Sequence, residues 1–294
     1  MKMAAGGIAI FLIALIATGS IILCAATLRV ARRAETSDAG SRWTNVNVRA
    51  EDGALLAAWY GASIPPQTDC VVILHGIGDS KRGVLGFASM FRDEGYSVLL
   101  PDSRAHGASG GDLVTYGLLE KWDVLRWLTF LRERGCRNIF GLGESLGAAV
   151  LIQAAALTPE FKAIAAESPF SDLRSIAAYR VQEALRLPHP LGGPLSRLFV
   201  RGASTYARLR YGLNFNLVSP LADMRNLSTP ILLIHGLDDT RTPPEHSRLL
   251  AATNRGASLW LVPDTAHCGA AATHPKEFRE RVLGWFTPFR STKL

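Results

Sequence analysis

The strongest constraint on the fold is a series of short aliphatic runs that recur along the chain, separated by segments with helical periodicity. Each run is four residues long and almost wholly apolar, and the run at 71–74 is β-branched in three of its four positions, as expected of strands that are buried on both faces. The alternation predicts an α/β protein with a mostly parallel, doubly wound sheet covered by helices on both sides. The runs lie at 71–74, 97–100, 139–142, 163–166, 231–234 and 259–262.

The segment before these runs has a different pattern. Val46 and Val48 alternate with polar residues, and Glu51-Asp52-Gly53 is typical of a hairpin turn followed by a returning strand at 54–60. We therefore expect an antiparallel hairpin at one edge of the sheet. Apolar residues at spacings of three and four predict helices between the strands. These helices are expected at 84–94, 118–131, 146–157 and 278–286.

Residues 171–229 interrupt the alternation of strands and helices. Such a long insertion, with helical segments of its own, is typical of a helical cap over a functional site. Two interpretations stay open: an ordinary solvated cap, or a cap that rests on an anionic membrane surface. The insertion is basic, because three acidic residues (Asp172, Glu183 and Asp223) accompany eight arginines: Arg174, Arg180, Arg186, Arg197, Arg201, Arg208, Arg210 and Arg225.

The N-terminus is apolar, with no charged residue between Met3 and Leu28. About 20 apolar residues suffice to cross a bilayer, so residues 8–26 predict a single-pass membrane anchor within residues 1–33. A short polar linker at 34–42 follows, and the remaining domain spans 43–294. A cleavable signal peptide is the alternative, with a weak cleavage site at 17–19. One lysine before the anchor and three arginines after it favour a cytoplasmic domain only slightly, so the side of the membrane stays open.

Charge and cysteine usage exclude some function classes. The net charge is +7, but no lysine run and no aromatic-interleaved basic motif is present, so nucleic-acid binding is not expected. The four cysteines contain no metal-spaced pair, so no metal site is expected either. Cys70 and Cys136 both precede strand-like runs. We expect free buried thiols there, with a disulfide in an oxidising compartment as the alternative.

The pentapeptide Gly143-Glu144-Ser145-Leu146-Gly147 lies between a predicted strand and a predicted helix. On a sharp strand-to-helix turn, a serine hydroxyl is exposed at the end of the sheet, where a base can reach it. The flanking glycines allow the helix to approach the neighbouring strands closely. Ser145 is therefore the candidate nucleophile.

A serine nucleophile needs a base and an acid that orients the base. His267 lies in the exit loop of the last predicted strand, and so follows the chain order serine, acid, histidine. The acid is expected after the strand at 231–234, where Asp238 and Asp239 are equivalent by spacing alone. Candidate oxyanion donors are the backbone N–H groups of Leu146, at a helix N-terminus, and Ile77, in a glycine-containing loop.

Together these motifs resemble those of the alpha/beta-hydrolase-fold serine hydrolases over residues 43–289. In that family the acid is usually the fourth residue after the strand-ending histidine, which implies Asp239. A serine at the elbow, where the dehalogenase and epoxide-hydrolase branches carry aspartate, argues against those branches. The fold also places Cys70 and Cys136 before neighbouring strands, which raises the case for a disulfide. The motifs are, in order, His75-Gly76-Ile77-Gly78, residues 102–109, Gly143-Glu144-Ser145-Leu146-Gly147, His235-Gly236-Leu237-Asp238-Asp239 and Ala266-His267.

An N-terminal anchor with these motifs is similar to membrane-anchored hydrolase-domain proteins, and so are residues 168–173 and 218–221. Ser103 and the arginine-rich cap depart from the relatives. The resemblance implies a membrane-bound serine hydrolase that cleaves a carboxylic ester or thioester through an acyl-enzyme, without cofactor or metal. Its substrate would be a small acyl ester, with lipids among the candidates. The alternatives are an aminopeptidase-like serine peptidase and a non-catalytic anchored scaffold.

Overall fold

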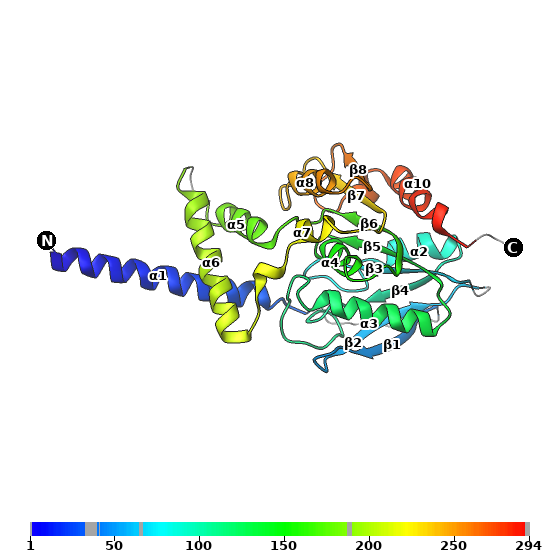
Figure 1. Ribbon diagram of the computed structural model, residues 1–294, viewed down its shortest axis with the longest axis horizontal. Coiled ribbons are helices and arrows are strands. Elements are labelled where there is room, and N and C mark those ends of the chain that lie inside the picture. The colour runs from blue at the N-terminus through cyan, green and yellow to red at the C-terminus, as the bar shows by residue number, and fades with distance from the viewer. Residues whose placement is uncertain (1, 33–39, 41, 65–66, 187–189, 292–294) are drawn as a thin grey trace.

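A computed structural model describes residues 2–32, 40, 42–64, 67–186 and 190–291, and its centre is an eight-stranded sheet (Figure 1). The hairpin β1–β2 is antiparallel, β2 pairs antiparallel with β4, and the remaining strands are parallel. The predicted α/β class and edge hairpin are confirmed. The strands follow one another across the sheet as β1 (Thr44–Arg49), β2 (Leu55–Gly61), β4 (Ser97–Pro101), β3 (Asp69–Leu74), β5 (Asn138–Glu144), β6 (Phe161–Glu167), β7 (Ile231–Gly236) and β8 (Ala257–Val262).

The two faces of the sheet pack into separate hydrophobic clusters. On β3, Val72 and Leu74 join one cluster while Val71 and Ile73 join the other, because successive side chains of a strand point to opposite faces. One cluster contains residues of α3 (Glu120–Glu133), α4 (Leu146–Ala155), α7 (Pro220–Met224) and α8 (Glu245–Thr253). The other contains residues of α2 (Leu85–Asp93), α9 (Ala270–Thr273) and α10 (Pro275–Phe286), which η2 (Thr287–Phe289) follows.

The chain between β6 and β7 forms a helical layer beyond the carboxyl ends of the parallel strands (Figure 1). The Asp172 carboxylate caps the first helix by accepting hydrogen bonds from the N–H groups of Arg174 and Ser175. The next helix ends at Gly212, whose φ of 72° is the left-handed conformation that glycine adopts without strain. The elements are α5 (Leu173–Ala184), α6 (Gly192–Tyr211), η1 (Phe215–Leu217) and α7.

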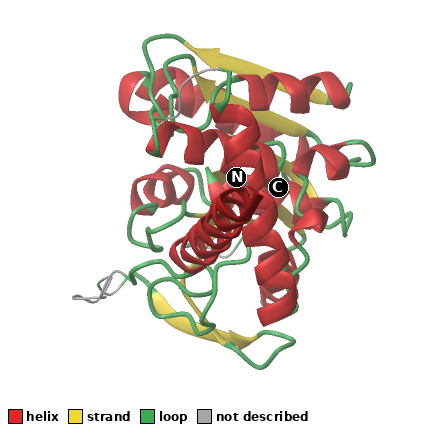
Figure 2. Cartoon of the chain, turned by 90° about the vertical axis from the view of Figure 1, so that its left-hand side faces the viewer, coloured by secondary structure: helices red, strands yellow, loops and turns green. Residues whose placement is uncertain are grey.

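The N-terminal helix α1 (Lys2–Leu28) projects from this layer and crosses α6 (Figures 1 and 2). Among the described residues, 10–28 form the one helical segment that is long and apolar enough to cross a membrane. Residues 10–15 are exposed, whereas Ser20, Cys24 and Leu28 form a stripe with helical spacing and only 2 % exposure. Of the predicted linker at 34–42, residues 34–39 and 41 lie outside the described residues.

The structure contains a disulfide between Cys70 and Cys136, with Cα atoms 5.8 Å apart. The expectation of free thiols at these positions is therefore wrong, and the alternative that the sequence left open holds. Cys70 lies on β3, and Cys136 lies between α3 and the neighbouring strand β5. Sequence spacing alone could not predict this disulfide, because the pairing of β3 with β5 is set by the tertiary fold.

Candidate active site

Ser145 occupies a sharp turn between β5 and α4. Its φ of +51° is unusual for a residue with a side chain, and such strain is typical of functional sites. The flanking glycines are required by packing. A Cβ atom on Gly143 would lie 2.6 Å from the Ala148 nitrogen, and one on Gly147 would collide with the Leu74 carbonyl. The turn therefore presents the serine hydroxyl while α4 packs directly against the sheet.

The structure brings together the three side chains that the sequence singled out. The Ser145 hydroxyl lies 2.9 Å from His267 Nε2, and His267 Nδ1 lies 2.7 Å from Asp239 Oδ2. Because a carboxylate only accepts hydrogen bonds, Nδ1 carries the proton and Nε2 is free to accept from the serine. The three residues come from the loops after β5, β7 and β8, at one end of the sheet.

Asp239 is held in its ionised form by its surroundings. Burial alone would raise the pKa of this carboxyl, but hydrogen bonds from His235, His267 and the Thr242 amide outweigh burial and hold the pKa well below its usual range. His235 Nε2 lies 3.2 Å from Oδ2 and 2.7 Å from the Thr242 carbonyl. Asp238, the other candidate acid, has an exposed side chain.

The candidate oxyanion donors lie beside Ser145. Leu146 is the first residue of α4, so its N–H group has no partner within the helix. Ile77 lies in the loop after β3, and both residues line the same pocket as Ser145. Both residues that carry the predicted donors therefore border the same pocket as the serine.

Two buried histidines, His75 and His106, fix the loop that contains Ile77, a role that their sequence motifs did not predict. His75 Nδ1 donates to the Gly76 carbonyl at 2.7 Å, and His106 Nε2 accepts from the Gly78 N–H at 3.0 Å. Burial lowers the pKa of His75 to about 4 and also lowers the pKa of His106, so both rings are neutral near pH 7. Their positions after β3 and β4 could have predicted that they lie close together, because parallel strands end at the same edge of the sheet.

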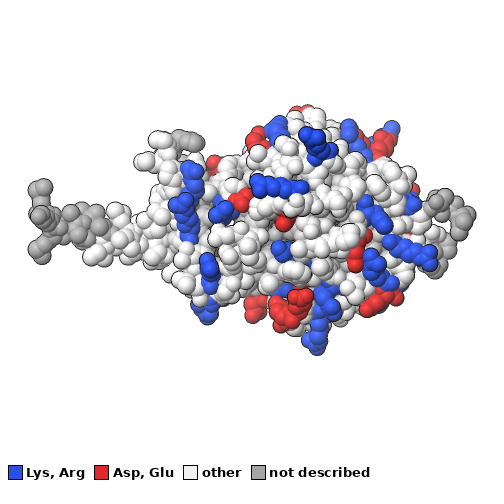
Figure 3. All heavy atoms as spheres, in the orientation of Figure 1, with Lys and Arg blue, Asp and Glu red and all other residues white. Residues whose placement is uncertain are grey.

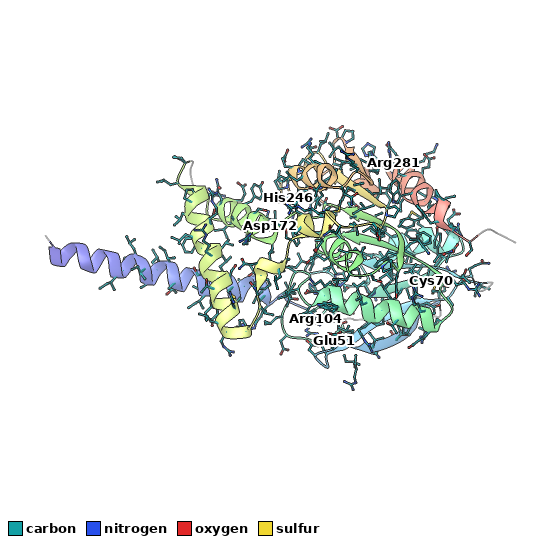
Figure 4. The ribbon with its side chains drawn as sticks, in the orientation of Figure 1. Glu51, Cys70, Arg104, Asp172, His246 and Arg281 are labelled. Atoms are coloured by element: carbon teal, nitrogen blue, oxygen red, sulfur yellow. A yellow bond between two sulfur atoms is a disulfide. The ribbon has the colours of Figure 1, made fainter. Side chains whose placement is uncertain are left out.

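A further histidine connects the cap to the core. His246 Nδ1, on α8, accepts a 2.8 Å hydrogen bond from the Ser171 hydroxyl and one of 3.2 Å from the Ser171 N–H, at the start of the cap. Figure 4 shows His246 close to Asp172, the N-cap residue of α5. The start of the cap is therefore joined to α8, the helix that follows the loop containing Asp239. Among the described residues, no three His, Cys, Asp or Glu side chains gather in a way that could hold a metal ion.

A pocket of about 450 Å³ opens over Ser145 and His267. Its walls are mostly apolar and come from α5, α6 and, unexpectedly, the end of α1. Arg174, Arg180 and Arg241 also line it, and no Asp or Glu appears among its described lining residues. The residues that α1 contributes are Leu23, Cys24, Thr27 and Leu28.

A second, larger groove of about 1180 Å³ runs between α5 and α6. It shares Arg174, Val200, Ser204 and Phe215 with the pocket over Ser145, so the two hollows adjoin. Figure 3 shows basic side chains gathered on the cap next to the uncharged surface of α1. The groove's further arginines are Arg197, Arg201 and Arg208.

Comparison with known proteins places the chain. Residues 71–281 match the model of the alpha/beta hydrolase family. The chain is 30 % identical over 217 residues to the uncharacterized protein YqkD of Bacillus subtilis (strain 168), covering 72 % of this chain and 69 % of that protein. It is 26 % identical over 208 residues to human protein ABHD12B, covering 68 % of this chain and 53 % of the human protein.

Solved structures agree on the fold. The esterase Pf2001 of Pyrococcus furiosus superposes with a TM-score of 0.71 at 23 % identity, over 88 % of this chain and 99 % of the esterase. A bacterial membrane phospholipase A superposes with a TM-score of 0.61 at 17 % identity, over 99 % of this chain and 96 % of that protein. These structures and the family match lead to one conclusion: the chain is a member of the alpha/beta hydrolase family.

Proposed function

We propose that the protein is a membrane-anchored serine hydrolase that cleaves a carboxylic ester or thioester through an acyl-enzyme intermediate. The observation that carries the proposal is the continuous hydrogen-bonded chain from Ser145 through His267 to Asp239 at the floor of an apolar pocket. The family match and the esterase neighbours support hydrolysis as the reaction class.

The mechanism follows from the protonation states of the three groups. His267 Nε2 takes the proton of the Ser145 hydroxyl as the oxygen attacks the carbonyl carbon, and Asp239 stabilises the imidazolium that forms. The N–H groups of Leu146 and Ile77, which border the same pocket, would stabilise the oxyanion. His267 then protonates the leaving alcohol or thiol. In the second half of the reaction, water attacks the acyl-enzyme while His267 takes a proton from it, and His267 returns that proton to Ser145 as the carboxylic acid leaves.

We propose that α1 is retained as a single-pass anchor rather than removed as a signal peptide. Ile10, Phe11 and Ile13 are about two-thirds exposed, which suits contact with lipid. The opposite face near the end of the helix is buried against α6, and a removed segment would leave that surface of the cap uncovered.

We also propose that the basic groove between α5 and α6 rests against anionic lipid headgroups. Arg197, Arg201 and Arg208 are exposed on α6, which itself packs against α1. A cluster of arginines beside a membrane helix is the arrangement that an anionic leaflet attracts.

The alternatives are less well supported. A peptidase that binds a substrate amine needs an acidic group in its pocket, and the described lining carries arginines instead. Of the three cap acids, the Asp172 carboxylate is occupied as the N-cap of α5. A non-catalytic scaffold would have no need for a strained serine in hydrogen-bond contact with a histidine.

A fluorophosphonate probe tests the proposal, because it labels only a serine that a base has activated. Purified full-length protein should be labelled, and Ser145→Ala should not. Ser171→Ala, which changes a cap serine that does not line the pocket, is the matched control and should still be labelled. Absence of labelling in the wild type, or equal labelling of Ser145→Ala, would reject the hydrolase assignment.

A further inference from the structure

The last two turns of α1 form part of the pocket over Ser145. Leu23, Cys24, Thr27 and Leu28 line this pocket, although they lie more than 110 residues before the serine. The opposite walls come from Ile176 and Val181 on α5 and from Val200 on α6, all of them apolar. The N-terminal helix therefore supplies one wall of a mostly apolar pocket whose other walls come from the hydrolase domain.

This wall is fixed in place by hydrogen bonds to the hydrolase domain. The Thr27 carbonyl accepts a bond of 2.8 Å from the Tyr116 hydroxyl, and the Leu28 carbonyl accepts one of 2.9 Å from the Val114 N–H. These are terminal carbonyls of the helix, which otherwise need water or a cap. Tyr116 lines the pocket as well, so one side chain both holds α1 and borders the site.

The same two turns present opposite surfaces. Cys24 is 2 % exposed on the pocket side, whereas Ile22 is 62 % exposed on the side that an anchor would turn toward lipid. An acyl chain that leaves the bilayer along the exposed side of α1 would therefore be separated from the pocket by one helix diameter, about 10 Å.

We propose that α1 is the wall that selects acyl-chain length, and that the substrate is an ester of a long-chain acid supplied by the surrounding bilayer. The acyl chain lies between α1 and the α5–α6 pair, with its carbonyl at Ser145. This inference rests on the proposed serine hydrolase function and assigns its substrate class.

A bulky side chain at Cys24 tests the wall directly. Wild type, Cys24→Trp and Ile22→Trp are assayed in detergent on p-nitrophenyl esters from butyrate to palmitate. In Cys24→Trp, the ratio of kcat/KM for palmitate to that for butyrate should fall about tenfold or more, because even one methylene in an apolar pocket changes selectivity by this factor. Ile22→Trp, which places the same side chain outside the pocket, should keep the wild-type ratio.

Cys24→Ala provides a second test if the tryptophan variant does not fold. Removing the sulfur enlarges the pocket without crowding, so the preferred chain should lengthen. Identical chain-length profiles in wild type, Cys24→Ala and any folded Cys24→Trp would overturn the inference. The failure of the proposed function gives a different result, because the wild type would then hydrolyse no ester and bind no fluorophosphonate.

The source of the chain is tested with protein reconstituted in phosphatidylcholine vesicles. A fluorogenic palmitoyl ester is placed either in the same vesicles as the protein or in separate vesicles without protein. Supply from the surrounding bilayer predicts hydrolysis at least about tenfold faster in the shared vesicles. Equal rates in the two arms would show that the ester arrives through water, and would reject bilayer supply.

Discussion

The Tyr116 hydroxyl donates a 2.8 Å hydrogen bond to the Thr27 carbonyl and so joins the pocket rim to the last turn of the N-terminal helix. Tyr116 itself has a φ of +57°, a conformation that costs free energy in a residue with a side chain. The contact is therefore maintained against local backbone strain. The hydrogen bond fixes the end of α1 to the hydrolase domain itself.

Tyr116→Phe should weaken the attachment of α1 without creating a cavity in the core. The variant loses one buried hydrogen bond and leaves a helix carbonyl unpaired, which we expect to destabilise the protein by about 1–2 kcal/mol. Thermal unfolding in detergent measures the change. Tyr60→Phe, on β2 and away from α1, is the matched control. Equal melting temperatures for Tyr116→Phe and the wild type would contradict the structural role assigned to this hydroxyl.

Asp239→Asn should reduce kcat for a soluble ester by about 10³–10⁴-fold, because an amide favours the wrong tautomer of the histidine. Asp238→Asn is the control. Its side chain is exposed, so we expect activity within about twofold of the wild type. Steady-state hydrolysis of p-nitrophenyl butyrate distinguishes the two. A larger loss in Asp238→Asn would reverse the assignment of the acid.

Glu167 makes the stability of the protein fall as pH rises. Burial raises the pKa of this carboxyl to about 7 from its ordinary value of 4.5. Between these two values the folded state holds a proton that the unfolded state has lost, so the free energy of unfolding decreases with increasing pH. The decrease reaches about 3 kcal/mol above pH 7.

Glu167→Gln cannot ionise, while its oxygen can still accept the 2.9 Å bond from the Ala270 N–H. Its free energy of unfolding should therefore fall less between pH 5 and pH 8 than that of the wild type, as measured by urea denaturation at both values. Glu280→Gln, an exposed position on α10, is the control. Parallel pH profiles for Glu167→Gln and the wild type would refute this account.

The Cys70–Cys136 bond closes a loop of 66 residues, and its loss should destabilise the domain by about 4 kcal/mol. Cys70→Ser with Cys136→Ser is compared with Cys268→Ser, since Cys268 has no disulfide partner. Unfolding in urea gives the difference. Mass spectrometry after thiol alkylation of protein from membranes should find Cys70 and Cys136 unmodified before reduction. Complete alkylation of both without reductant would show that the bond does not form in the cell.

Replacement of Arg197, Arg201 and Arg208 by Gln should weaken the attraction of the cap to anionic membranes. Each basic residue near such a surface contributes about 1 kcal/mol, and salt reduces the effect. Hydrolysis in vesicles that contain phosphatidylglycerol should fall in the triple variant at low salt, while hydrolysis in neutral vesicles stays the same. Replacement of Arg248, Arg255 and Arg281 by Gln, at three exposed positions elsewhere, controls for total charge. The same loss in neutral vesicles would argue against a headgroup contact.

Much of the fold could be predicted because its strands are buried on both faces. Runs such as Val71–Leu74 have no polar positions, and only a covered parallel sheet accommodates several of them in one chain. The proximity of Ser145, Asp239 and His267 was predictable for a related reason. Each follows a strand of that sheet, and the carboxyl ends of parallel strands meet at the same edge.

The docking of α1 was not predictable, because lipid and protein interior select the same residues. Cys24 and Leu28 face protein while Ile21 and Ile22 do not, yet hydropathy does not distinguish the two pairs. The roles of His235 and His75 were missed for another reason. The sequence places both directly after strands, and their partners on distant loops become visible only when the sheet is assembled.

The buried stripe on α1 runs from Ser20 to Leu28, so it occupies the second half of the apolar segment at 10–28. The 19 residues of that segment span about 28 Å, close to the roughly 30 Å thickness of a hydrocarbon core. If the segment is the proposed membrane anchor, the turns that complete the crossing are the ones already packed against α6. The proposed anchor would therefore hold the cap at the membrane surface, with no free tether between the helix and the hydrolase domain.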